Sequence, residues 1–442
     1  MKIVINNGLV IDPKNSINDY LNLEITNGKI SKISKDKLVG DYEIDATNLC
    51  VTPGFIDIHM HEDIMKDGKI QIDIFERMLK MGVTTAIGGN CGIGPNNIGE
   101  YLKEYEKNPL INFKMLLPHK ILRDYIGAED RYTSLSSDEI EKMYRYGEKI
   151  IKENNLLGIS FGIEYIPGIN REELVNLAKL GENKIIAVHL RKDGDDIIES
   201  CEEFFEIAKY INSHFQISHI GSMAGYGQMR KFLNYIQNKI DNGLDIGCDC
   251  YPYTAFSTHI GSAVFDDGYI ESHGGDYSRL EVLDGKYKGQ RCTKEIFNYL
   301  RKNSPDTLVA GHLMVDEDIK IAFQDKNVVV ASDGLLSESG NGHPRAVGTF
   351  PKFLRKYVLD DKIMSLSEGV AKITNQPADF YGLKAGTLSI GANGDITIFS
   401  LDELKDNATF DKLTSPSGIK YVLVNGSIAL KDGEITTKRE FI

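Results

Sequence analysis

From residue 54 onward, short apolar runs alternate along the chain with longer segments that mix apolar and charged positions. The runs have the length of buried strands, and the longer segments, such as 194–212, repeat their apolar residues at helical spacing. We expect eight strands, near residues 54–60, 83–91, 113–118, 158–165, 184–190, 215–220, 243–251 and 327–333. This alternation is typical of repeated βα units, so it predicts an α/β protein with a parallel (β/α)8 TIM barrel.

Both ends of the chain show a different pattern, in which short strand-like runs are broken by turn residues. Asn7-Gly8 and Asn27-Gly28 are hairpin signals near the start, and similar runs return near the end. We therefore expect residues 1–52 and 384–442 to pair into one small, discontinuous β-sandwich domain. Residues 53–383 would form the catalytic barrel beside it.

Two segments inside the barrel region add detail to this division. Ser137 precedes acidic residues and a run of helical spacing, so we expect it to cap the start of a helix. Residues 258–305 are rich in Gly, Asp and Ser and separate the last two predicted strands. Long irregular insertions are usually functional or disordered, and we expect this one to lie over the barrel mouth.

Bulk composition narrows the function classes. The 442 residues include 51 Lys and Arg against 64 Asp and Glu, giving a formal net charge of −13 that repels phosphate backbones, so we expect no nucleic-acid partner. No secretion signal and no run of about 20 apolar residues is evident, which favours a soluble cytoplasmic protein without membrane contact. Six scattered cysteines favour reduced thiols. The oligomeric state stays open, with a homo-oligomer among the options.

Potential metal ligands fall at the ends of the predicted strands. His59 and His61 lie two residues apart at the end of the first strand, so their side chains share one face. Active sites of such barrels lie at the carboxyl ends of the strands. Four further residues close other apolar runs: Cys91, His189, His219 and Asp333. Imidazole and thiolate together are a donor set that suits zinc.

Nine segments in order along the chain resemble the amidohydrolase superfamily and, within it, the N-acyl-D-amino acid deacylases (D-aminoacylases). The opening motif is PGFIDIHMHED at 53–63. The others are GVTTAIGGNCGIGP (82–95), GISFGIEYIPG (158–168), VHLRKDGD (188–195), QISHIG (216–221), CDCYPYTAFST (248–258), ASDGL (331–335), HPRAVGTFPKFLRKYV (343–358) and ITNQPADFYGL (373–383). They span nearly the whole chain, so the resemblance is far more specific than the histidine pair alone.

The resemblance implies a zinc-dependent hydrolase of a linear amide bond, acting on an N-acyl-D-amino acid or a similar small molecule. His59 and His61 would bind one metal ion, Cys91 would bridge, and His189 and His219 would bind a second. One or two zinc ions per chain would activate water for attack on the amide carbonyl. Asp333, as acid and base, would pass the water's proton to the leaving amine.

Substrate-binding candidates follow from the carboxylate that an N-acyl amino acid carries. Arg345, in the loop after Asp333, is the leading candidate to bind this carboxylate. The family pattern adds Tyr251, Ser257 and Tyr165. Relatives carry a lysine at the position of Gly221, so another group would have to replace it in this chain.

Two other functions remain as alternatives. A cyclic amidohydrolase of the hydantoinase or dihydroorotase kind would use the same barrel and metal chemistry. Such enzymes bridge their metals with a carboxylated lysine at the fourth strand, where this sequence has Glu164, and Cys91 also favours the deacylase. A non-catalytic barrel scaffold is the third hypothesis, although all the ligand positions are kept.

Overall fold

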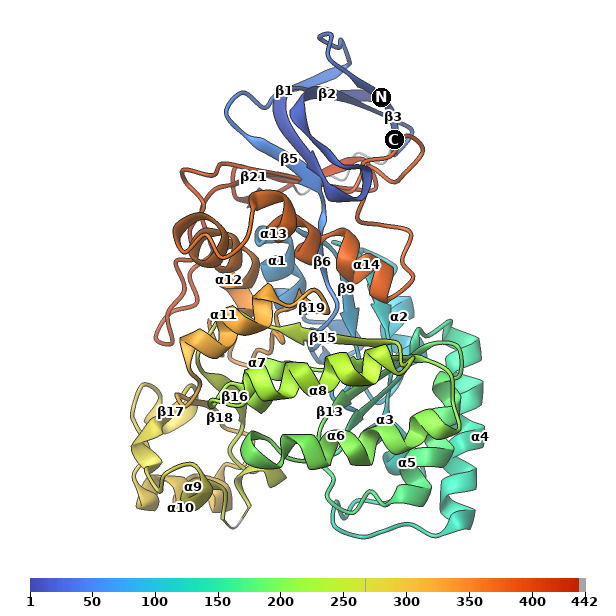
Figure 1. Cartoon of the computed structure of the whole chain (residues 1–442), viewed down its shortest axis with the longest axis vertical. Helices are drawn as coiled ribbons and strands as arrows, with labels where there is room; N and C mark the ends of the chain where they lie inside the picture. Colours follow the sequence, from blue (N-terminus) through green and yellow to red (C-terminus); the bar gives the residue numbers. More distant parts are fainter. Residues whose placement is uncertain (267, 437–442) are drawn as a thin grey trace.

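The computed structural model describes residues 1–266 and 268–436, and Figure 1 shows a β-rich end joined to a larger α/β body. Strands from both ends of the chain pair into one nine-stranded sheet with the order β23-β22-β21-β20-β5-β1-β2-β3, and β4 pairs with β1. The members are β1 (Lys2–Asp12), β2 (Ile17–Thr26), β3 (Lys29–Ser34), β4 (Tyr42–Asp45), β5 (Cys50–Pro53), β20 (Ile396–Phe399), β21 (Ile419–Val424), β22 (Ser427–Lys431) and β23 (Glu434–Ile435). Antiparallel pairing of β5 with β20 joins the two ends of the chain.

The body of the molecule is a barrel of parallel strands, as the sequence pattern predicted. The strands are β6 (Phe55–Asp57), β9 (Val83–Gly88), β10 (Asn112–Met115), β11 (Leu117–Pro118), β12 (Gly158–Gly162), β13 (Ile185–His189), β14 (His214–Ile217), β15 (Ile246–Cys250) and β19 (Val328–Val330). They form two parallel sheets, β10-β9-β6 and β11-β12-β13-β14-β15-β19, and only Leu116 separates β10 from β11. A parallel bridge between Met60 and Gly334 closes the ring on its other side.

Helices surround the barrel (Figure 1). They are α1 (Asp73–Lys80), α2 (Ile98–Tyr105), α3 (His119–Tyr125), α4 (Ser137–Asn154), α5 (Arg171–Ala178), α6 (Ile197–Phe205), α7 (Ile220–Ala224), α8 (Met229–Asp241), α11 (Asp316–Gln324), α12 (Arg345–Lys352), α13 (Leu366–Ile373) and α14 (Asn375–Phe380), with a π-helical turn at Phe353–Asp360. A short hairpin, β7 (Met65–Lys66) and β8 (Lys69–Ile70), follows the first barrel strand. Among the described residues, no helix is both long and apolar enough to cross a membrane.

The insertion that follows β15 has regular structure of its own. It contains β16 (Phe256–His259), α9 (Tyr269–Ser272), β17 (Leu280–Val282), α10 (Lys294–Asn303) and β18 (Leu308–Gly311), and its strands form an antiparallel sheet in the order β16-β18-β17. This sheet differs from the irregular loop that the Gly, Asp and Ser content of the sequence indicated. Arg131 anchors the segment by donating to the carbonyl of Gly261.

Two local predictions are wrong in detail. Ser136, not Ser137, caps α4, because its side chain and that of Glu139 form a reciprocal capping box. Asn7-Gly8 makes no hairpin: it lies within β1, where the pairing register with β2 shifts and Asn7 has φ of 68°. An Asn-Gly pair supplies positive φ to a bulge as well as to a turn, so the same residues fit either structure.

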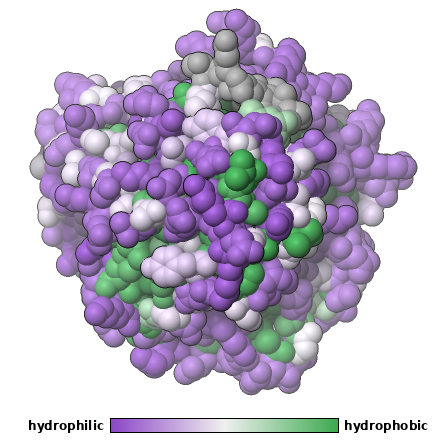
Figure 2. Space-filling model, turned by 90° about the horizontal axis from the view of Figure 1, so that it is seen from above, coloured by the Kyte–Doolittle hydropathy of each residue, from purple (hydrophilic) through white to green (hydrophobic). Residues whose placement is uncertain are grey.

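The surface seen from the end of the nine-stranded sheet is mainly hydrophilic, with hydrophobic residues in small groups (Figure 2). This agrees with the excess of acidic residues, which gives the chain its formal charge of −13.

A buried ion pair stabilises the part of the barrel that carries the second strand-end loop. Arg123 of α3 donates to Glu173 of α5 through Nε at 2.8 Å and Nη2 at 2.6 Å, and both side chains are fully buried or nearly so. His119 contacts the same carboxylate at 2.8 Å. The N terminus of α3 also donates from the Lys120 amide to the carbonyl of Gly92, so this helix supports the loop that carries Cys91.

We predict that Arg123→Met lowers the free energy of unfolding by about 3–5 kcal/mol, because it leaves Glu173 as a buried and incompletely paired charge. Urea unfolding followed by circular dichroism measures the change. Arg145→Met is the matched control: this arginine pairs with Glu141 at 2.8 Å on an exposed face of α4, and its loss should cost less than about 1 kcal/mol. Equal effects of the two variants would contradict the prediction.

Candidate metal centre

Six side chains meet at the carboxyl ends of the barrel strands. His59 and His61 follow β6, Cys91 follows β9 and His219 follows β14. His189 is the last residue of β13, and Asp333 follows β19. All but His61 are almost completely buried. The structure therefore brings every predicted metal ligand, and the predicted acid/base, into one cluster.

Cys91 lies at the middle of the first group of donors. Its Sγ is 3.3 Å from His59 Nε2 and 3.3 Å from His219 Nε2, and these three ligand atoms lie within 4.8 Å of one another. The fourth donor is His189, whose Nδ1 is 2.8 Å from His219 Nε2. Burial alone would raise the pKa of the Cys91 thiol, but the imidazoles of His59 and His219 hold it well below its usual value. The thiolate is the form that binds metals.

A second group of donors shares His59 with the first. His61 Nε2 is 3.1 Å from Asp333 Oδ1, and His59 Nε2 is 3.4 Å from the same oxygen. The ligand atoms of these three residues also lie within 4.8 Å of one another. Each group could hold one cation, and the two groups share His59.

The donor set fits a divalent transition metal. Imidazole nitrogens, the Cys91 sulfur and a carboxylate oxygen meet in two overlapping groups of three at the ends of several strands. Buried groups of this kind are costly unless they are paired or coordinate an ion. The chemistry of the donors is therefore the kind that zinc binds.

Three of these residues have a left-handed backbone, which is uncommon for residues other than glycine. The φ angles are 53° at Cys91, 36° at His219 and 49° at Asp333. Each such residue costs on the order of 1–3 kcal/mol unless its surroundings hold it. The His219 amide donates to the Asp249 carboxylate at 2.8 Å, and the Asp333 amide donates to the His59 carbonyl at 2.7 Å. Strain of this kind concentrated at one cluster supports a functional role for the cluster.

Asp249 is a site residue that the sequence reasoning missed. It lies in the buried strand β15, and its Oδ1 contacts His59 Nδ1 at 3.1 Å as well as the His219 amide. Its other oxygen accepts from Gln216 at 3.0 Å. Carboxylates behind metal-binding histidines orient the rings and raise their basicity. The available signal was a single acidic residue inside the apolar run IGCDC.

Glu164 has a similar relation to His189. Its Oε2 is 2.6 Å from His189 Nε2, on the ring edge opposite the atom that faces His219. This contact directs Nδ1 of His189 toward the centre. The glutamate therefore orients a donor, and in the sequence only its place after the fourth strand indicated this.

Arg345 is the first residue of α12 and pairs with Asp333 at 2.9 Å. Burial alone would raise the pKa of Asp333, but the Arg345 guanidinium and the imidazoles of His219 and His59 hold it well below the usual range. Arg345 is 2% exposed, and it donates from Nη2 to the Ser257 carbonyl. Its Nε and Nη1 have no hydrogen-bond partner among the described residues. Two buried donors are therefore available to a ligand.

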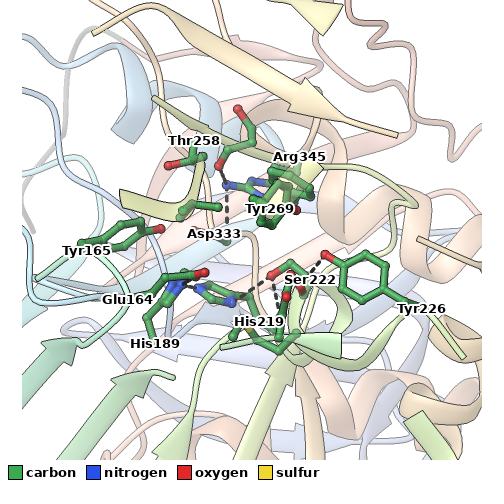
Figure 3. A pocket seen from close by; sticks show the side chains of 15 residues that line it. Glu164, Tyr165, His189, His219, Ser222, Tyr226, Thr258, Tyr269, Asp333 and Arg345 are labelled. Atoms are coloured by element: carbon green, nitrogen blue, oxygen red, sulfur yellow. Dashed lines mark hydrogen bonds and ion pairs between the residues drawn. The ribbon is translucent and has the colours of Figure 1, made fainter. Parts of the chain in front are cut away.

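A cavity opens beside these residues (Figure 3). Its wall includes Tyr165 and Ser257, as expected for substrate-binding residues, and β16 and α9 of the insertion supply part of it. The lining residues are Glu164, Tyr165, His189, Asp193, His219, Ser222, Met223, Tyr226, Phe256, Ser257, Thr258, Val264, Tyr269, Asp333 and Arg345.

Tyr251 differs from the expectation. It does not line the cavity: its ring lies 4.6 Å from the Arg345 guanidinium carbon, and its hydroxyl is directed to Met314 Sδ at 3.9 Å. Its place at the end of β15 points the ring beneath the arginine, where it can stabilise the cation through its π face. Tyr251 therefore contacts Arg345 and does not face the cavity.

The structure also changes the interpretation of Gly221. A Cβ at this position would lie 3.0 Å from Cys250 Sγ, Ile319 Cδ1 and Met314 Cε, so the position faces the packed side of α7. Ser222, the next residue, lines the cavity. The glycine therefore leaves no gap in the cavity wall.

Comparisons with known proteins agree with this geometry. Residues 312–429 match the model of the amidohydrolase family. The N-acyl-D-glutamate deacylase of Alcaligenes xylosoxydans xylosoxydans is 29% identical, with 96% of this chain and 93% of that protein covered. A dihydroorotase of Clostridioides difficile is 35% identical, with 96% of this chain and 99% of that protein covered.

The fold comparison extends over nearly the whole chain as well. The crystal structure of N-acyl-D-glutamate deacylase from Bordetella bronchiseptica, in complex with zinc and a phosphonate inhibitor, is similar with a TM-score of 0.84 and 25% identity. It covers 97% of this chain and 96% of its own. Since the fold, the motif residues and a relative of 35% identity all agree, this chain belongs to the amidohydrolase family of metal-dependent hydrolases.

Proposed function

We propose that this protein is a zinc-dependent deacylase that hydrolyses the linear amide bond of an N-acyl-D-amino acid. One observation carries the proposal: Cys91 Sγ lies between His59 and His219, 3.3 Å from each, beside an aspartate paired with an arginine. The deacylases among the relatives, one of them a structure with zinc and a mimic of the tetrahedral intermediate, support this choice of reaction.

In this proposal His59, His61, Cys91, His189 and His219 would hold one or two zinc ions. When bound, zinc polarises the scissile carbonyl and makes water a stronger nucleophile at neutral pH. Asp249 and Glu164 keep the rings of His59 and His189 in place for this purpose.

Asp333 performs the proton transfers. The Arg345 guanidinium and the neighbouring imidazoles keep Asp333 ionised, so its carboxylate can accept a proton from the attacking water, and the carboxylic acid formed can donate that proton to the departing nitrogen. The amine can thereby leave as a neutral molecule.

Arg345 binds the substrate carboxylate with the donors that the protein leaves unpaired, Nε and Nη1. Tyr165, whose ring centroid is 4.4 Å from that of His189, forms the wall beside the reacting bond together with Ser257. Tyr251 acts behind Arg345, through the ring contact described above.

A second candidate is hydrolysis of a cyclic amide, which the dihydroorotase of 35% identity favours. The position after the fourth strand argues against it, because Glu164 there pairs with His189 and no lysine is available to bridge two metals.

The two candidates are distinguished by assaying one zinc-loaded preparation on both substrate classes. We expect amine release from N-acetyl-D-amino acids, no ring opening of hydantoins or dihydroorotate, and loss of activity on chelation with recovery on adding zinc. N-acetyl-L-amino acids serve as the stereochemical control. Turnover of the cyclic compounds alone would rule out the deacylase.

Asp333→Asn should retain the metal content of the parent protein and lose about 10²–10⁴-fold in kcat, because an amide cannot accept the proton of the attacking water. Steady-state kinetics and elemental analysis of the same samples measure both properties. Asp245→Asn is the matched control, since this aspartate also contacts a histidine, His214, at 3.0 Å but is 71% exposed and far from the cluster in the barrel. A rate near that of the parent would exclude Asp333 as the proton-transfer group.

A further inference from the structure

We propose that the cavity contains a binding site for an organic cation, formed by Asp193, Glu164 and the hydroxyl of Tyr269. The inference rests on the proposed function and adds the class of substrate: an N-acyl amino acid that carries an ammonium or guanidinium group in addition to its carboxylate.

Asp193 is an acidic residue of the cavity wall whose contact with a charged partner is long. It lies in the loop after β13, lines the cavity and has a side chain that is 14% exposed. Its charged partner is His273. The distance from His273 Nε2 to Asp193 Oδ2 is 3.4 Å, which is longer than a normal hydrogen bond. A carboxylate has room for about four hydrogen bonds, so most of its capacity is open to a ligand.

Glu164 lines the same cavity and interacts electrostatically with Asp193. One of its oxygens contacts His189 Nε2 at 2.6 Å, and its side chain is also 14% exposed. Two carboxylates in one partly buried site repel each other, and a cation bound between them removes this repulsion.

Tyr269 provides an independent indication of a ligand. It is 9% exposed, comes from α9 of the insertion and lines the cavity (Figure 3). Its hydroxyl interacts with that of Tyr226, and its oxygen accepts no hydrogen bond of normal geometry in the described part of the chain. Asp193 and Glu164 line the same cavity. A buried oxygen that accepts no hydrogen bond is costly, and a ligand that donates an N–H would satisfy it.

The charges of the cavity wall indicate the same class of ligand. Asp333 and Arg345 form an ion pair at 2.9 Å, so their charges offset each other. Glu164 contacts His189 at 2.6 Å, Asp193 is the other acidic side chain of the wall, and the lining residues include no lysine. A substrate with an acidic side chain would therefore meet two carboxylates, whereas an ammonium group would be attracted.

Such a substrate spans the cavity with opposite charges at its two ends. Its carboxylate binds the free donors of Arg345, and its cationic group reaches the Asp193 side. The cation could belong to the amino acid side chain or to the acyl group, since both extend away from the scissile bond, and the experiment below distinguishes them.

The test compares kcat/KM within pairs of substrates that differ by one ammonium group. The first pair is N-acetyl-D-lysine and N-acetyl-D-norleucine, and the second is N-(4-aminobutanoyl)-D-norleucine and N-butanoyl-D-norleucine. We expect the cationic member of at least one pair to be preferred by about tenfold, and N-acetyl-D-glutamate to be the poorest substrate. The preferred pair shows which part of the substrate carries the cation.

Substitutions test which residues cause the preference for cationic substrates. Asp193→Asn should reduce the preference to about threefold or less, and Tyr269→Phe should reduce it by a smaller factor. Asp196→Asn is the matched control from the same loop, since this aspartate is 58% exposed and pairs with Lys192 at 3.7 Å, and it should leave the preference intact.

Two results would overturn the inference. One is hydrolysis of the neutral substrates without preference in either pair, which would leave the deacylase function standing. The other is a preference that survives Asp193→Asn. If the zinc-loaded enzyme hydrolyses none of these amides, the proposed function itself fails and the inference with it.

Discussion

The metal centre depends on how the barrel closes between its first and last strands. Beyond β6 and β19, the Asp333 amide donates to the His59 carbonyl at 2.7 Å and the His61 amide donates to the Gly334 carbonyl at 2.9 Å. These bonds fix the register in which both histidine side chains turn toward the Asp333 carboxylate. Since neighbouring residues of a strand face opposite sides, a shift of one residue would remove both histidines from the site.

A layer of acidic residues behind the centre gives it a fixed geometry. Asp57 accepts from the amides of His59 and Ser332, and so links the first strand to the last. Asp249 contacts the ring of His59 and the backbone of His219. These carboxylates are buried and hydrogen-bonded, and Asp249 holds the left-handed backbone at His219 that brings its ring to Cys91. Donors preorganised in this way need little rearrangement when a cation binds.

Sequence reasoning located the donors because their placement follows from general rules. Two-residue spacing puts His59 and His61 on one face, and parallel strands bring their carboxyl ends to the same rim. The eight barrel strands were also predictable, because apolar runs and amphipathic segments alternate along the chain.

The features that escaped prediction depend on tertiary packing. Whether Asp249 faces the centre depends on the twist of β15, and whether Tyr251 reaches the cavity depends on where α12 places Arg345. Gly221 stands where relatives carry a lysine, and the sequence alone did not show that this position lies on the packed side of α7. The insertion forms strands despite its Gly and Asp content, because β16 and β17 both pair with the apolar strand β18.

X-ray absorption at the zinc edge of the zinc-loaded protein tests the central claim most directly, because it identifies the atoms bound to the metal. The account predicts one sulfur neighbour at about 2.3 Å together with nitrogen and oxygen neighbours near 2.0–2.1 Å. The sulfur signal should disappear in Cys91→Ser, while Cys250→Ser, which alters a buried thiol in β15, should leave it unchanged. A zinc shell made only of nitrogen and oxygen in the parent protein would contradict a metal centre built around Cys91.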